Sequence, residues 1–232
     1  KLALMEGENP IEKQGQVRWY EKPVRGHIYG VALDPSLGTG GDPAAIQVWD
    51  LTTMRQIAEW QHNLTVIQKQ VAIMSEICKY IAEETDDPAN LYYSVENNTL
   101  GEAALVAIGE IGEENIPGIF LSEPRKVGAG TRYRRGFTTT AKSKLAACAK
   151  LKSLIETKRM HVASKLLISE LKTFVAAGNS FEAKLYMNEV QILQSQEYKY
   201  INETKPKMTG LLNKALSFDA LVLVQTDANY QA

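Results

Sequence analysis

Three strand-forming apolar segments follow one another in close succession and constrain the fold more than any other feature. They cover residues 27–33, 44–51 and 54–61, with short turns between them. Turns this short join neighbouring strands in antiparallel order. A helical pattern over residues 65–84 and another strand over residues 91–96 come next, and a strand–helix–strand connection implies parallel pairing. The sequence therefore predicts an α/β domain whose mixed central sheet, an antiparallel meander plus parallel strands, is flanked by helices.

The rest of the chain adds further elements around this sheet. Residues 1–26 are polar and interrupted by glycine and proline, which is typical of an arm or linker, and residues 27–232 then form one domain. Residues 122–137 are predicted to be a polar loop. The apolar periodicity predicts strands over residues 116–122 and 181–187 and helices over residues 102–112, from a cap among Thr138–Thr140 to about Lys158, 164–177 and 211–226.

Composition narrows the kinds of site that the chain can carry. Cys78 and Cys148 lie in helical patterns without metal-binding spacing, so we expect both to be reduced structural residues. The three histidines are far apart in sequence, which disfavours a zinc site. No apolar run is long enough to span a membrane and no signal peptide is evident. We expect an intracellular protein in which any metal is held by carboxylates.

Two predicted strands end in a carboxylate. Asp34 follows the first strand and Glu96 ends the strand at residues 91–96. If the two strands are parallel neighbours, both acids lie at the same edge of the sheet, where ligands usually bind. A divalent cation would offset their repulsion, and oxygen ligands without histidine suit Mg²⁺ or Mn²⁺. The alternative is that each acid is simply a polar turn residue.

The glycine-rich turn over residues 35–43 could be mistaken for a phosphate-binding loop. It lacks the Gly-Lys-Ser/Thr ending of a Walker A sequence, and a strand rather than a helix follows it. An ATPase or dinucleotide enzyme is therefore disfavoured, and no organic cofactor is expected. The alternative role of the turn is a flexible hairpin loop.

A local basic segment stands out in a chain whose net charge is −1. Arg125–Lys152 contains nine cationic residues and no acidic one. Clustered cations can contact the phosphates of double-stranded DNA without reading its sequence, although a run of charges is also common on a solvated surface. The candidate phosphate contacts are Arg132, Arg134, Arg135, Lys142 and Lys144.

Three stretches resemble, in order and spacing, the nuclease domain of the tailed-bacteriophage terminase large subunit. GVALDPSLGTGGDPAAIQV is similar to its first motif, a strand ending in a metal-binding Asp with a second Asp after a glycine-containing turn. YYSVENNTLGEAAL is similar to the second, a strand ending in a metal-binding Glu. GFTTTAKSKLAACAKLKSLIETKRMHVASKLLISELKTFV resembles the segment that follows. The likeness covers about residues 28–182 and implies a ribonuclease-H-like fold.

The resemblance also implies a set of site residues. Asp34 and Glu96 would be metal ligands and Asp42 a supporting acid. The third motif of the family is an Asp-Asp pair, and the chain departs from it, because SFDALVLV has Asp219 at the first position and Ala220 at the second. Asp219 is the candidate third ligand, with Glu182 and Glu189 as alternatives.

The function implied by the resemblance is cleavage of double-stranded concatemeric viral DNA during genome packaging, by two-metal phosphodiester hydrolysis with Mg²⁺ or Mn²⁺. Its partners would be the terminase ATPase motor domain, the portal and the small terminase subunit, in the cytoplasm of the host. No Walker motif lies in the chain, so we expect a separate, monomeric domain or fragment. The alternatives are a Holliday-junction resolvase or other ribonuclease-H-like nuclease, and a non-catalytic DNA-binding assembly module.

Overall fold

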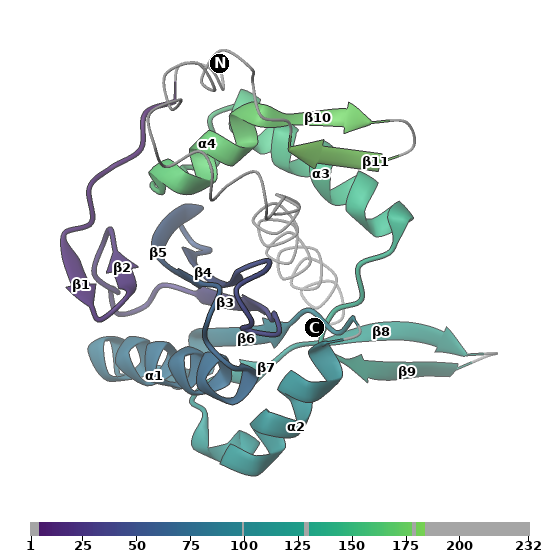
Figure 1. Cartoon of the computed structure of the whole chain (residues 1–232). Coiled ribbons are helices and arrows are strands. Elements are labelled where there is room, and N and C mark those ends of the chain that lie inside the picture. The colour runs from purple at the N-terminus through teal and green to yellow at the C-terminus, as the bar shows by residue number, and fades with distance from the viewer. Residues whose placement is uncertain (1–4, 99, 128–129, 178–179, 184–232) are drawn as a thin grey trace.

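A seven-stranded mixed sheet forms the centre of the molecule (Figure 1). The computed structural model describes residues 5–98, 100–127, 130–177 and 180–183. The strand order is β1-β2-β5-β4-β3-β6-β7; β1 to β5 pair antiparallel, whereas β3, β6 and β7 pair parallel. This arrangement confirms the predicted meander with parallel strands beside it. The strands are β1 (Glu12–Gln14), β2 (Val17–Trp19), β3 (Tyr29–Asp34), β4 (Ala44–Asp50), β5 (Arg55–His62), β6 (Leu91–Val95) and β7 (Ile119–Phe120).

Helices cover both faces of the sheet (Figure 1). The helices α1 and α2 pack on one face, and α3 and α4 lie over the other. The α-helices are α1 (Ile67–Thr85), α2 (Gly101–Ile111), α3 (Ala141–Glu156) and α4 (Lys165–Thr173), and the short 3-10 helices are η2 (Pro88–Asn90) and η3 (Glu113–Asn115).

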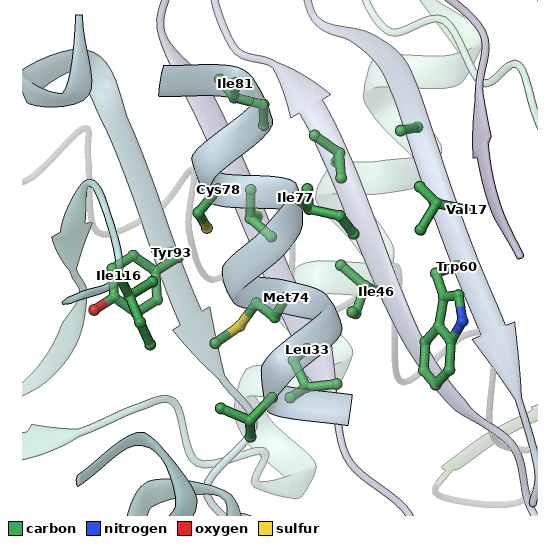
Figure 2. Packing of buried hydrophobic residues seen from close by; sticks show 14 of the residues in the cluster. Val17, Leu33, Ile46, Trp60, Met74, Ile77, Cys78, Ile81, Tyr93 and Ile116 are labelled. Atoms are coloured by element: carbon green, nitrogen blue, oxygen red, sulfur yellow. The ribbon is translucent and has the colours of Figure 1, made fainter. Parts of the chain in front are cut away.

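The larger core lies between the sheet and α1. Apolar residues of α1 recur every three or four positions, so they form one stripe along the helix. Figure 2 shows this stripe over the side chains of the central strands. The buried residues labelled there include Met74, Ile77, Cys78 and Ile81 of α1 and Leu33, Ile46 and Trp60 of the sheet.

A smaller core lies on the opposite face of the sheet. Ala32 of β3 and Trp49 of β4 are fully buried there, under apolar residues of α3 and α4. Successive side chains of a strand point to opposite faces, so β3 contributes Leu33 to one core and Ala32 to the other. Because of this alternation, the last residue of a strand points to the face opposite that of the residue before it.

Residues 5–26 contain more regular structure than their polar composition suggests. Within this predicted arm, β1 and β2 extend the sheet, and β2 pairs with β5 through Arg18↔Glu59 and Trp19↔Ala58. Trp19 and Tyr20 are buried. The strands are short and follow glycine and proline, so no alternating pattern long enough to predict them exists.

Two predictions outside the central sheet were wrong in their secondary structure. Residues 122–137, predicted as a loop, contain the hairpin of β8 (Ser122–Val127) and β9 (Gly130–Arg135). The predicted helix over residues 164–177 ends at Thr173, and Phe174–Ala177 is strand β10, paired with β11 (Ser180–Ala183). Both segments form small sheets outside the central sheet. Their residues therefore lack the apolar pattern from which the strands of the central sheet are predicted. The predicted helix over residues 211–226 lies outside the described residues.

Both cysteines are free thiols. Cys78 is fully buried in the larger core, where desolvation raises the pKa of its thiol. Cys148 is partly buried against the smaller core. Among the residues that the structure describes, no helix combines the length and apolar character needed to cross a membrane.

Candidate metal centre and nucleic-acid interface

Asp34 and Glu96 stand at the ends of two adjacent parallel strands. β3 and β6 are in register up to Leu33↔Val95, and Glu96 N donates to Leu33 O at 2.9 Å. Leu33 and Val95 both belong to the larger core. Because side chains alternate along a strand, the acid that follows each of them belongs to the opposite face, on the side of α3 and α4. The two carboxylates predicted from sequence thus share one edge and one face of the sheet.

The environments of the two acids differ. Glu96 is 5% exposed, and its Oε1 accepts a hydrogen bond of 2.7 Å from Asn98 Nδ2. Within the described part of the chain the carboxylate of Glu96 forms no salt bridge. Asp34 is less buried than Glu96 and is half-buried. A buried carboxylate without a cationic partner is costly. A divalent cation at this edge would offset that cost, so the donor set fits Mg²⁺ or Mn²⁺.

No third acid joins Asp34 and Glu96 among the side chains that the structure describes. No three histidine, cysteine, aspartate or glutamate side chains gather there in a metal-binding group. Asp42 is exposed in the turn between β3 and β4 and does not complete such a group. Glu182 lies in β11, opposite Val175. Asp219, together with the alternative Glu189, lies outside the described residues.

The glycine-rich turn after Asp34 is anchored on the start of α1. Gln70 is fully buried; its Nε2 donates to Ser36 O at 2.7 Å and to Thr65 O at 2.6 Å, and its Oε1 accepts from Ser36 N at 3.2 Å. Gly38 has φ +71°, and a Cβ there would overlap the carbonyl of Thr65. Gln70 therefore holds the turn that follows Asp34.

The three candidate arginines of β9, in the β8–β9 hairpin, differ in their environments. Arg132 is exposed and Arg134 half-buried, with Arg134 opposite Glu123 in the ladder. Arg135 forms a salt bridge with Glu113, and its guanidinium lies 5.0 Å from the centre of the Phe120 ring. Arg135 is thus held by contacts with η3 and β7, whereas the exposed side chain of Arg132 is accessible to a phosphate.

The two candidate lysines lie in the first turn of α3. Thr140 caps this helix as expected: its Oγ1 accepts from Ser143 N at 3.1 Å, and Ser143 Oγ accepts from Thr140 N at 2.8 Å. Lys142 is exposed and Lys144 half-buried. Cations at a helix N-terminus oppose the helix dipole. A bound phosphate would relieve this repulsion and also accept from the free backbone N–H groups.

Sequence reasoning did not single out Asn97, Asn98 or Gln70. Asn98 donates to Glu96, and Asn97 is buried directly beside it. The asparagine pair after Glu96 is visible in the sequence, but amides are also common in turns. Gln70 could be noticed in the sequence as a polar residue within the apolar stripe of α1. Its role can be recognised only when its hydrogen-bond partners are known.

The meander of β3, β4 and β5, with β6 and β7 parallel to β3 and helices on both faces, is the ribonuclease-H-like fold of terminase nuclease domains. The large terminase nuclease from thermophilic phage G20c with bound magnesium is 19% identical, with a TM-score of 0.55 over 80% of this chain and 85% of that one. The large terminase nuclease domain of Thermus phage P74-26 is 16% identical, with a TM-score of 0.57 over 94% and 91%. The likeness shows the fold. No protein-family model and no curated protein matches the sequence.

Proposed function

We propose that the chain is a Mg²⁺- or Mn²⁺-dependent endonuclease that cleaves double-stranded concatemeric viral DNA during genome packaging. The observation that carries the proposal is the position of Asp34 and Glu96 at the ends of adjacent parallel strands, on one face of the sheet. The shared fold with terminase nucleases, one of them solved with bound magnesium, supports it. The hard oxygen donors of such a carboxylate pair are suited to divalent cations.

In this proposal Asp34 and Glu96 hold the cations, and Asp219 supplies the third carboxylate. Bound metal would activate a water molecule and stabilise the charge that develops on the phosphodiester. The buried position of Glu96 and its hydrogen bond from Asn98 fix the orientation of one ligand before the metal arrives. Preorganisation of this kind lowers the cost of assembling the site.

The DNA backbone would lie across the basic surface formed by β9 and the start of α3. Arg132 and Arg134 contact phosphates from the hairpin, and Lys142 and Lys144 from the helix, where backbone N–H groups also attract phosphate. Arg135 anchors the hairpin instead. In packaging, the terminase ATPase motor, the portal and the small subunit would bring the DNA to this surface.

A plasmid-nicking assay tests the proposal. With Mg²⁺ or Mn²⁺ the parent protein should convert supercoiled DNA to nicked and linear forms. Asp34→Asn should reduce the rate by at least about 100-fold, since even loss of a group that only supports a metal ligand costs 10–100-fold. Glu76→Gln, which removes an exposed carboxylate from α1, is the matched control and should retain parental activity. Equal activity in Asp34→Asn and the parent would reject the site.

A substrate panel separates the alternatives. Duplex DNA, an RNA–DNA hybrid and a four-way junction should be compared at equal concentration. Preference for duplex supports a packaging nuclease, whereas a strong preference for junctions would make the chain a resolvase. A parent protein that binds DNA but cuts none of the substrates with either metal would be a non-catalytic assembly module.

A further inference from the structure

We propose that Asn97 is a positioning residue, which ties the metal-binding end of β6 to the base of the β8–β9 hairpin. The inference rests on the proposed function, because its consequence is the placement of Glu96 as a metal ligand. Asn97 follows Glu96 directly and is only 4% exposed.

Three hydrogen bonds join the two segments around Glu96. Phe137 N donates to Val95 O at 2.9 Å, and Asn97 N donates to Phe137 O at 2.6 Å. The third comes from a side chain: Asn97 Nδ2 donates to Arg135 O at 2.7 Å. On its other side Glu96 is bound to β3 through Leu33 O. Glu96 therefore lies between a sheet strand and the end of the hairpin.

The backbone at Gly136 makes the side-chain bond possible. Its φ is +71°, and a Cβ there would come within 2.6 Å of Val95 O and 3.1 Å of Asn97 Cβ. A glycine in this left-handed conformation lets the chain turn closely against the end of β6. The carbonyl of Arg135 is then within reach of the Asn97 side-chain amide. A shorter side chain at position 97 could not span this distance.

The base of the hairpin is fixed on its other side as well. Arg135 pairs with Glu113 of η3 and lies over Phe120 of β7. These contacts attach the hairpin to the domain, but they do not reach Glu96. The side chain of Asn97 adds to the backbone bonds a link from Arg135 O to the residue next to Glu96, so that Glu96 and the DNA-contacting arginines of β9 hold one relative position.

Loss of the amide should therefore loosen Glu96 without unfolding the hairpin or removing a DNA contact. In Asn97→Ala we expect the Kd for Mn²⁺, measured by titration calorimetry, to rise by about 10-fold or more. The half-saturating metal concentration in the nicking assay should rise in parallel. The KM for DNA, and DNA affinity measured with Ca²⁺, should stay within about twofold. Asn115→Ala, which removes an exposed asparagine that donates to Ile111 O, is the control and should match the parent.

Hydrogen exchange gives a readout that is independent of activity. The amides of Asn97 and Phe137 should exchange at least about 10-fold faster in Asn97→Ala, whereas the β8–β9 ladder keeps its protection. Asn97→Ser serves the same purpose if the alanine variant folds poorly, because its side chain is too short to reach Arg135 O.

The outcomes separate this inference from the proposed function. A parent protein that neither binds Mn²⁺ nor cuts DNA would refute both the nuclease and the metal-positioning role. If the parent is active and Asn97→Ala or Asn97→Ser keeps parental metal affinity and exchange rates, only the role of Asn97 is overturned. A rise in the KM for DNA without a change in metal dependence would likewise contradict it.

Discussion

Glu96 is almost completely buried, and its described side-chain partner, Asn98, is neutral. In the absence of metal such a carboxylate lowers stability, because burial removes its hydration without supplying an opposite charge. Residues of this kind are expected at functional sites, where binding, and not folding, determines the choice of side chain. Asp34 is more exposed than Glu96 and is half-buried.

Glu96→Gln should separate the two roles of the residue. The glutamine keeps the shape and an oxygen for Asn98, but it removes the buried charge. In EDTA we expect the free energy of unfolding to rise by about 1 kcal/mol, measured by urea denaturation. Addition of Mn²⁺ should raise the melting temperature of the parent and leave that of the variant unchanged. A variant that is less stable than the parent in EDTA and equally stabilised by Mn²⁺ would contradict this account of Glu96.

Among the secondary-structure elements, those of the central sheet could be predicted from sequence, and the peripheral ones could not. β3 and β4 are largely apolar, β5 follows β4 after a tight turn, and α1 carries a long apolar stripe, so these elements could be recognised. The hairpin β8–β9 is rich in cations, and its β9 strand is largely exposed. Its pairing gives no alternation of apolar and polar residues, which is the signal that sequence reasoning uses.

The turn after Asp34 depends on a single helical side chain. In Gln70→Ala, Ser36 N and the carbonyls of Ser36 and Thr65 lose their partner. Unsatisfied buried polar groups of this kind cost about 1–3 kcal/mol in total, which urea denaturation should detect. Lys69→Ala, at the exposed neighbouring position, should change stability by less than about 0.5 kcal/mol. Equal stability of the two variants would show that Gln70 does not anchor the turn.

The start of α3 can be tested through the salt dependence of DNA binding. Replacement of Lys142 and Lys144 by alanine should weaken binding uniformly across sequences. The slope of log K against log salt should fall by about 0.9 for each phosphate contact that is lost. Arg135→Ala should instead lower stability, because the arginine pairs with Glu113. An unchanged salt slope in the double lysine variant would exclude a phosphate contact at α3.

For the molecule as a whole, two cores on opposite faces of one sheet hold the candidate site in place. The face under α3 and α4 carries the ends of β3 and β6, and its core is formed in part by helices distant in sequence. The N-terminal segment joins this side: Glu8 N donates to Ala163 O at 2.8 Å, and Glu8 Oε1 lies 2.6 Å from His161 Nε2. Sequence reasoning predicted the layers but not this contact, because a polar segment with glycine and proline gives no sign of its distant partner.

Several buried groups link the stability of the whole fold to alkaline pH. Desolvation raises the pKa of Tyr20, Tyr29, Tyr93 and Cys78 above their ordinary values. The folded state therefore keeps protons that the unfolded chain releases above about pH 9 to 10. Stability should be constant below that range and fall above it, by up to about 1.4 kcal/mol per pH unit for each group. Urea unfolding between pH 8 and 10.5 measures this fall, and a flat profile would contradict it.

That Asp34 and Glu96 follow adjacent strand ends could be predicted, because each acid comes at the end of an apolar strand and the two strands pair in parallel. That these acids bind metal stays a prediction. The third ligand could not be predicted in the same way. The chain departs from the Asp-Asp pattern at Asp219 and Ala220, and the sequence between β11 and Asp219 has no clear period. Its assignment depends on a direct view of the bound metal.

A structure determined from crystals soaked in Mn²⁺ is the most direct test of whether Asp34 and Glu96 share divalent ions. The anomalous signal should lie between the two strand ends, with oxygens of both carboxylates about 2.0–2.3 Å from manganese and a third acid, Asp219 by our proposal, completing the site. Manganese bound elsewhere, or bound by only one of the two acids, would contradict the account.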